Sequence, residues 1–100
     1  MQRVLLDLNN PVFQEKWFAL EYEDQMGVLV SLGKIRNMDW PQLYQDRGLR
    51  WEAIKSRSGD SGPRVYSFRI TPRARALAYR EGNALCLLSL HPDHDSAYKK

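Results

Sequence analysis

The chain has 100 residues, of which 43% are hydrophobic and 27% are charged, and its formal net charge is +3. This composition is typical of one globular domain spanning residues 1–100, and it excludes a largely disordered chain. The sequence has no long apolar run, so no membrane-spanning helix and no membrane partner are expected. The single cysteine, Cys86, excludes an intramolecular disulfide and a cysteine-ligated metal cluster. No signal-peptide pattern follows Met1, and together these features indicate a cytoplasmic protein.

The charges are distributed unevenly along the chain. Residues 1–46 contain four Lys or Arg residues and seven Asp or Glu residues, a net charge of −3. Residues 47–100 contain eleven Lys or Arg residues and five Asp or Glu residues, a net charge of +6. Most of these cations are arginines, whose planar guanidinium group matches phosphate oxygens. The second half therefore favours binding of a polyanion such as RNA, although a solvated surface would show the same charge.

The first half of the chain predicts one strand followed by helices. Alternating apolar residues predict a strand over residues 3–8. Asn10 and Pro11 are typical of a helix start, and Phe13, Trp17 and Leu20 form one apolar stripe. A second helix is expected from Glu23 to Arg36, with residues 21–24 as the corner between the two helices. A third, short helix is expected between Asp39 and Gly48.

The second half predicts a series of strands. They are expected at residues 51–57, 64–70, 75–80 and 84–90, with a loop at residues 58–63 and a turn at residues 81–83. In the clearest strand, Tyr66, Phe68 and Ile70 share one face and Arg69 lies on the other. The fold class is therefore α+β. The N-terminal strand, the helical hairpin and the short third helix are expected to pack on one face of a mainly antiparallel sheet formed by a C-terminal meander.

Four residues of the second half suggest catalysis: Arg69, Arg75, His94 and Tyr98. Cleavage of RNA by its own 2′-hydroxyl group needs a base, an acid and cations that neutralise the developing charge. Histidine can transfer the protons near neutral pH, arginine stays charged, and tyrosine can stack on a base. This chemistry requires no metal and no cofactor. The residues expected to contact RNA are Lys55, Arg57, Arg69, Arg73 and His91.

The same residues also have simpler explanations. His91, next to Pro92, can cap a turn; His94, between two aspartates, can belong to a surface ion pair; and Tyr98 can anchor the C-terminus. A metal site is a further alternative, because the ligand types are suitable, although the spacing matches no standard motif. Its ligands would be His91, Asp93, His94 and Asp95.

The last third of the sequence resembles the RelE/ParE superfamily of type II toxins. The resemblance rests on three strings: Tyr66-Ser67-Phe68-Arg69-Ile70, Arg75-Ala76-Leu77-Ala78-Tyr79-Arg80-Glu81-Gly82-Asn83, and Leu87-Leu88-Ser89-Leu90-His91-Pro92-Asp93-His94-Asp95-Ser96-Ala97-Tyr98. It implies a RelE-like fold and an endoribonuclease that cuts mRNA, either free or on the ribosome, and is neutralised by a cognate antitoxin.

The resemblance also implies residue roles. Arg69 would hold phosphate, Arg75 would stabilise the transition state, and His94 and Tyr98 would form a C-terminal catalytic pair. Ser67 departs from the pattern, because some RNA-cleaving members have lysine there, and the acidic neighbours of His94 are unusual beside a phosphate site. Two alternatives have the same fold: a non-enzymatic toxin of the ParE type that binds DNA gyrase, and a non-toxic relative that binds nucleic acid or protein.

Overall fold

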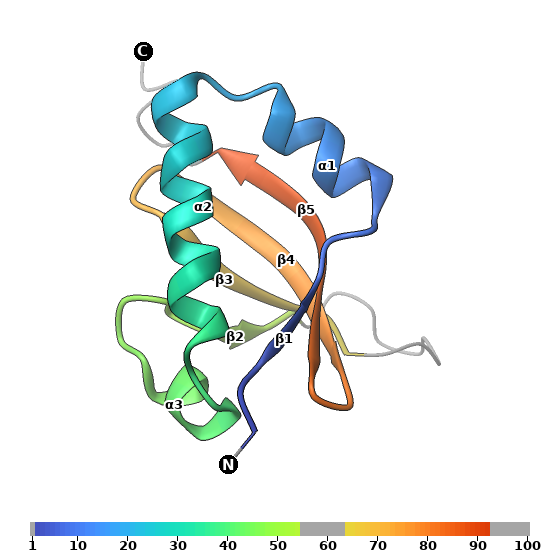
Figure 1. The fold of residues 1–100 in the computed structure, drawn as a ribbon, viewed down its shortest axis with the longest axis vertical. Coiled ribbons are helices and arrows are strands. Elements are labelled where there is room, and N and C mark those ends of the chain that lie inside the picture. Colours follow the sequence, from blue (N-terminus) through green and yellow to red (C-terminus); the bar gives the residue numbers. More distant parts are fainter. Residues whose placement is uncertain (1, 55–63, 93–100) are drawn as a thin grey trace.

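The structure is a computed structural model that describes residues 2–54 and 64–92 (Figure 1). The helices are α1 (Pro11–Phe18), α2 (Tyr22–Arg36) and α3 (Trp40–Gln45). The strands are β1 (Leu5–Asp7), β2 (Glu52–Ala53), β3 (Tyr66–Thr71), β4 (Ala74–Glu81) and β5 (Ala84–Pro92). The expected order of one strand, three helices and a run of strands is therefore confirmed.

The five strands form one sheet in the order β1-β5-β4-β3-β2. Strands β2 to β5 pair antiparallel with their neighbours along the chain, as expected for a meander. Strand β1 pairs parallel to β5, so the first and last strands of the sequence are neighbours in the sheet. The turn between β4 and β5 uses Gly82 at a φ of 61°, a conformation that glycine adopts without the Cβ clash of other residues.

The helical hairpin covers one face of this sheet, with α2 lying across β3 and β4 (Figure 1). The Asn10 side chain accepts a hydrogen bond of 2.8 Å from the Val12 amide, and this caps α1 as the sequence predicts. The hairpin is joined by the Trp17 Nε1 atom, which donates to the Gln25 carbonyl oxygen at 3.2 Å. Gly27 allows close packing, because a Cβ atom there would lie 3.2 Å from the Thr71 side chain on β3.

The predicted corner between the two helices was wrong in position. Helix α2 already begins at Tyr22, so Glu23 and Asp24 belong to its first turn and not to a loop. Negative side chains are favourable there, because the helix dipole places partial positive charge at the N-terminus. The connection is correspondingly shorter, running from Ala19 to Glu21.

The core lies between the helices and the sheet. Phe68 and Ile70 of β3 are 0% and 1% exposed, which confirms the predicted buried face of that strand. They pack with apolar residues of the helices and of the neighbouring strands, namely Phe13, Val28, Leu32, Ile35, Ala76, Ala78, Leu87 and Leu90. The helices thus cover one face of the sheet, and the other face carries Arg69, Arg75 and Leu77 among its residues.

An aromatic cluster closes the end of the sheet next to α3. Trp51 stacks on Tyr66 with a ring-centroid distance of 4.8 Å and on Phe68 at 5.6 Å. The Arg80 guanidinium lies 4.2 Å from the centre of the Trp40 ring. The strand predicted from Trp51 to Arg57 is formed at Glu52 and Ala53, and its last residues, Lys55 to Arg57, lie outside the described residues.

Among the residues described, no helix is long and apolar enough to cross a membrane.

Phe68→Ala should lower the free energy of unfolding by about 3–5 kcal/mol, because it removes a fully buried aromatic ring. Val12→Ala on α1 is the control: Val12 is 46% exposed, so this change should have little effect. Urea denaturation followed by circular dichroism measures both variants. Equal unfolding midpoints for Phe68→Ala and the wild type would contradict the placement of Phe68 in the core.

Candidate functional site

Two arginines and a histidine form a row across three neighbouring strands. Arg69 on β3 is directly opposite Arg75 on β4, and Arg75 is directly opposite His91 on β5. Because Phe68 and Ala76 point into the core beneath the helices, their neighbours Arg69 and Arg75 lie on the other face of the sheet. We call Arg69, Arg75 and His91 the basic row. It gathers positive charge on the face of the sheet opposite the helices.

Arg75 is the centre of the polar contacts on this face. Its Nη2 atom donates to the Ser67 hydroxyl at 2.6 Å and lies 4.0 Å from the Glu52 carboxylate on β2. Arg75 is 31% exposed at its side chain and Glu52 is 64% exposed, so the pair is open to solvent. Arg69 donates from Nη1 to the Pro72 carbonyl oxygen at 3.0 Å, which orients its guanidinium group at the β3–β4 turn.

His91 supplies the one titratable group of the row with a shifted pKa. Its Nε2 atom lies 2.8 Å from the Ser89 hydroxyl oxygen. Partial burial lowers the pKa of His91 below its usual value of 6.5, and the nearby positive charge of Lys16 lowers it further. The imidazole is therefore mainly neutral at pH 7 in the unliganded protein. A bound phosphate would favour the protonated form and raise this pKa.

The arrangement is suited to holding a phosphate between two proton-transfer groups. The guanidinium groups of Arg69 and Arg75 can donate charge-assisted hydrogen bonds to phosphate oxygens. The Glu52 carboxylate lies on one side of Arg75, towards β2, and the His91 imidazole lies on the other side, on β5. A carboxylate can accept a proton, and an imidazole that becomes protonated can donate one, so these side chains are of the types that acid–base catalysis uses.

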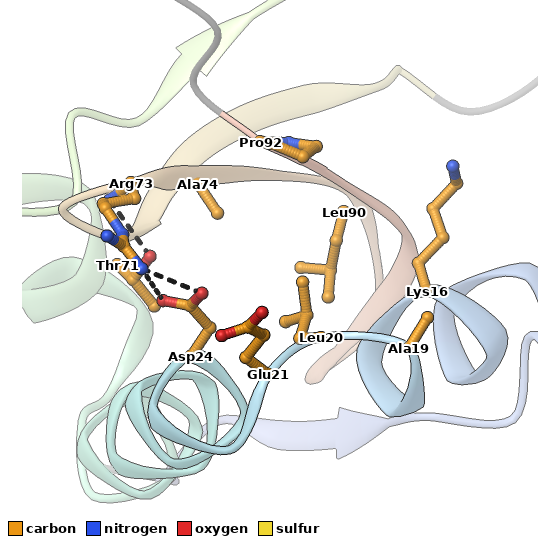
Figure 2. A pocket seen from close by; sticks show the side chains of 10 residues that line it. All are labelled: Lys16, Ala19, Leu20, Glu21, Asp24, Thr71, Arg73, Ala74, Leu90 and Pro92. Atoms are coloured by element: carbon orange, nitrogen blue, oxygen red, sulfur yellow. Dashed lines mark hydrogen bonds and ion pairs between the residues drawn. The ribbon is translucent and has the colours of Figure 1, made fainter. Parts of the chain in front are cut away.

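A cavity of about 620 Å³ lies between the helical hairpin and the sheet (Figure 2). Its walls come from α1, from the start of α2, from the β3–β4 turn and from the end of β5. The lining residues are Lys16, Ala19, Leu20, Glu21, Asp24, Thr71, Arg73, Ala74, Leu90 and Pro92.

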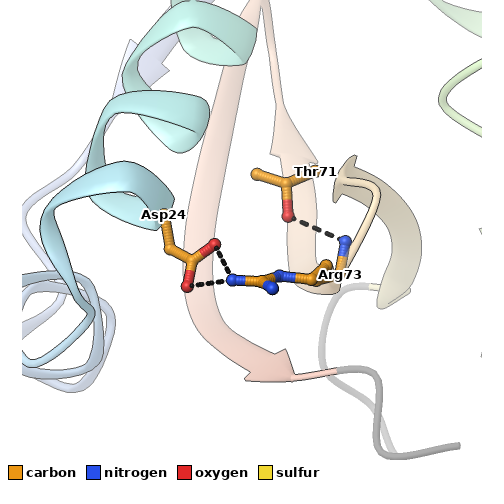
Figure 3. Close-up of polar contacts among 3 residues, drawn as sticks. All are labelled: Asp24, Thr71 and Arg73. Atoms are coloured by element: carbon orange, nitrogen blue, oxygen red, sulfur yellow. Dashed lines mark hydrogen bonds and ion pairs between the residues drawn. The ribbon is translucent and has the colours of Figure 1, made fainter. Parts of the chain in front are cut away.

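An ion pair spans the wall of this cavity. The Arg73 Nη2 atom lies 3.0 Å from both carboxylate oxygens of Asp24, and the Arg73 amide donates to the Thr71 hydroxyl at 3.2 Å (Figure 3). The pair links the β3–β4 turn to the first turn of α2. The Arg73 guanidinium is thus turned towards α2 and is not part of the basic row.

The structure brings together three of the residues predicted from the sequence: Arg69, Arg75 and His91. Arg73 lies apart from them, and its contact with RNA stays a prediction. The remaining predicted site residues, Lys55, Arg57, His94 and Tyr98, lie outside the described residues. The described part of the chain has no cluster of three metal-ligating side chains, and Asp93, His94 and Asp95 of the metal alternative fall beyond it.

Sequence reasoning missed Glu52, Ser67 as a partner of Arg75, and Ser89 as a partner of His91. Glu52 lies about 23 residues from Arg75 in the sequence and reaches it only because β2 pairs with β3, so that Glu52 is opposite Ser67. Ser89 could have been predicted as a neighbour of His91, because residues two apart on a strand lie on the same face of the sheet.

Comparison with known proteins adds evidence from structure and not from sequence. The sequence matches no protein-family model and no curated protein. The structure is similar to RelE in the archaeal RelE–RelB complex from Pyrococcus horikoshii, with a TM-score of 0.67 and 10% sequence identity over 94% of this chain and 99% of that one. The chain has the RelE toxin fold.

Two further solved structures share this fold. A copper-bound mutant toxin from Helicobacter pylori gives a TM-score of 0.52 at 17% identity, over 95% of this chain and 98% of that one. YoeB from Staphylococcus aureus, in the structure of its dimer, gives 0.53 at 16% identity, over 87% and 93% of the two chains. The predicted RelE-like α+β architecture is thereby confirmed.

A pH titration of His91 tests the electrostatics of the candidate site. The pKa of His91 should lie below 6.5, and Lys16→Met should raise it, because removing a nearby cation makes the protonated ring less unfavourable. Lys34→Met is a matched control, since Lys34 is paired with Asp46 and does not shift His91. NMR of the imidazole C–H signals measures all three proteins. A pKa of His91 above 6.5 would contradict the described environment of the ring.

Proposed function

We propose that the protein is the toxin of a type II toxin–antitoxin system and a metal-independent endoribonuclease that cleaves mRNA, either free or on the ribosome. The observation that carries this proposal is the basic row, with Glu52 beside Arg75 and Ser89 beside His91. The RelE fold supports it, since RelE from P. horikoshii is in complex with RelB. By the same argument a cognate antitoxin is the expected protein partner.

In this proposal Arg69 and Arg75 bind the scissile phosphate. Attack of the 2′-hydroxyl oxygen on phosphorus places extra negative charge on the phosphate oxygens in the transition state. A guanidinium group that is already held in position stabilises this charge without reorganisation. Arg75 is held by Ser67 and Glu52, and Arg69 by the Pro72 carbonyl oxygen. Both cations are therefore oriented before RNA binds.

Glu52 and His91 move the two protons. The Glu52 carboxylate accepts the proton of the 2′-hydroxyl group as the new bond from oxygen to phosphorus forms. The His91 imidazolium donates a proton to the 5′-oxygen as the bond from that oxygen to phosphorus breaks. The products are a 2′,3′-cyclic phosphate and a 5′-hydroxyl end. Binding of the phosphate beside His91 supplies the negative charge that raises its pKa and allows it to be protonated.

His94 and Tyr98 remain the sequence-based candidates for the C-terminal catalytic pair. They lie beyond the described residues. Variants of His91 and His94 therefore decide which of the two histidines donates the proton.

Cell-free translation with the purified protein, followed by mapping of mRNA 5′ ends, tests the function. We expect translation to stop and discrete new RNA ends with 5′-hydroxyl groups to appear, because the proposed mechanism leaves that group. A short free RNA without ribosomes shows whether the ribosome is required. If translation and RNA both survive, the endoribonuclease proposal is wrong, and a gyrase supercoiling assay then tests the ParE-like alternative.

Arg75→Ala should slow cleavage at least about 100-fold, the scale of a lost transition-state donor. Arg3→Ala is a control of equal charge change, because Arg3 is exposed, is hydrogen-bonded to Asn37 and precedes the edge strand β1, which β5 and β4 separate from β3. Single-turnover rates at saturating RNA measure the chemical step. A loss smaller than tenfold for Arg75→Ala would exclude it from the transition state.

His91→Gln and His94→Ala separate the two candidate proton donors. If His91 is the donor, His91→Gln should remove most of the cleavage and His94→Ala should remove little. In the wild type, kcat/KM should then fall as pH rises through the lowered pKa of free His91, because this parameter reports the unliganded protein. The opposite pattern of activities would assign proton donation to His94.

A further inference from the structure

Helix α2 has two apolar faces, and only one of them is used in the core. Val28, Leu32 and Ile35 are buried against the sheet. On the other side of the helix, Tyr22 is 73% exposed, Met26 38%, Leu29 48% and Val30 69%. Single exposed apolar residues are normal on a protein surface, whereas a contiguous group of them indicates an interaction site.

These exposed residues fall on one line along the helix. At about 100° per residue, positions 22, 26, 29, 30 and 33 lie within roughly 100° of the helix circumference, opposite the buried face. Gly33 is near the middle of this sector, and a Cβ atom added there would meet nothing within 4 Å. We call Tyr22, Met26, Leu29, Val30 and Gly33 the outer stripe. It is about 16 Å long, from the helical rise of 1.5 Å per residue.

Charged residues beside the outer stripe have opposite signs at its two ends. Glu23 lies in the first turn of α2 and Lys34 in the last turn. Both lie on the same flank of the stripe, next to Val30 on the helical wheel. Lys34 is paired with Asp46 at 3.3 Å, yet its side chain remains 53% exposed, so its ammonium group can serve a second carboxylate. A surface with an acidic end and a basic end is complementary to itself when it is turned around.

We infer that the outer stripe binds the outer stripe of a second copy of this chain, with the two α2 helices antiparallel about a twofold axis. In an antiparallel pair centred on Val28, Met26 is level with Val30 of the second copy, and Tyr22 lies within one residue of Gly33 of the second copy. The tyrosine ring then covers the position where no side chain exists. The same register places Glu23 beside Lys34 of the second copy, and the twofold axis repeats this pair.

The dimer is compatible with an open basic row. The outer stripe lies on the solvent side of α2, whereas the basic row lies on the sheet face turned away from the helices (Figure 1). Two copies joined through α2 therefore present their basic rows on opposite sides of the assembly. One helix face from each copy is a small interface, so we expect weak association that depends on protein concentration.

Sedimentation velocity of the purified protein over a hundredfold range of concentration tests the inference. The wild type should shift from monomer to dimer as concentration rises. Val30→Asp should remain monomeric, because it places a charge in the centre of an apolar contact. Val12→Asp is the matched control, since Val12 is 46% exposed on α1 outside the stripe, and it should dimerise like the wild type. Thermal unfolding of each variant shows that the fold is retained.

A charge exchange identifies the partner and the orientation. Glu23→Lys alone and Lys34→Glu alone each create two like-charged contacts in an antiparallel pair, and each should weaken self-association about tenfold. When the two single variants are mixed, both contacts become attractive, so the mixture should associate more tightly than either variant alone. Sedimentation of the mixture, with one variant labelled by a fluorophore, measures this.

Three results would overturn the inference. The first is a wild type that remains monomeric at all concentrations. The second is Val30→Asp that dimerises like the wild type. The third is a mixture of the two single charge variants that fails to associate. If the wild type is monomeric and Val30→Asp instead abolishes binding of a separately encoded protein, that other protein and not a second copy occupies the stripe. None of these measurements needs RNA cleavage, so they stand or fall separately from the proposed function.

Discussion

The antiparallel register of β3, β4 and β5 is the constraint on which the candidate site depends. It pairs Arg69 with Arg75 and Arg75 with His91, and thereby places side chains from three strands in one line. A shift of one residue in either pairing would turn the affected side chains to the opposite face, under the helices. The buried residues between them oppose such a shift, because Phe68, Ala76 and Leu90 would then leave the core. The hydrophobic core thus fixes the positions of charged groups that it does not contact.

This constraint also explains why the positive charge lies on one face. An arginine under the helices would need an ionic partner or would lose its hydration, and both are costly. Arg80, which does lie on the helical side, is placed over the Trp40 ring and donates to the Tyr44 hydroxyl at 3.0 Å. Arg73, at the edge, is held by Asp24. Of the four arginines on β3, on β4 and in the turn between them, Arg69 and Arg75 are the two on the face that the helices do not cover.

The sequence predicted the parts of the fold that depend on local patterns. The alternation of Phe68 and Ile70 with Arg69 indicated which face of β3 is buried, and Asn10 with Pro11 indicated the start of α1. Glu52 could not be found in this way, because β2 has only two residues and thus no alternation to reveal its face. The Asp24–Arg73 pair was equally hidden, since it joins residues 49 positions apart whose meeting depends on how α2 lies across the sheet. Only part of the basic row could be predicted from the sequence. Arg69 and Arg75 flank one tight turn, which indicates that they are neighbours. The residue of β5 opposite Arg75 depends on a register that includes a bulge between Leu77 and Ala78.

The contact between Arg75 and Glu52 has two opposite effects on a phosphate site. A carboxylate 4.0 Å from the guanidinium reduces its attraction for an anion, and it also repels the anion directly. The pair is solvent-exposed and at the limit of ion-pair distance, so the loss in phosphate affinity is small. In the proposed mechanism Arg75 holds the phosphate, and the carboxylate beside it accepts the proton of the 2′-hydroxyl group. A site that only bound RNA would gain from a neutral residue at position 52. The presence of a carboxylate there therefore favours a site that moves protons over one that only binds.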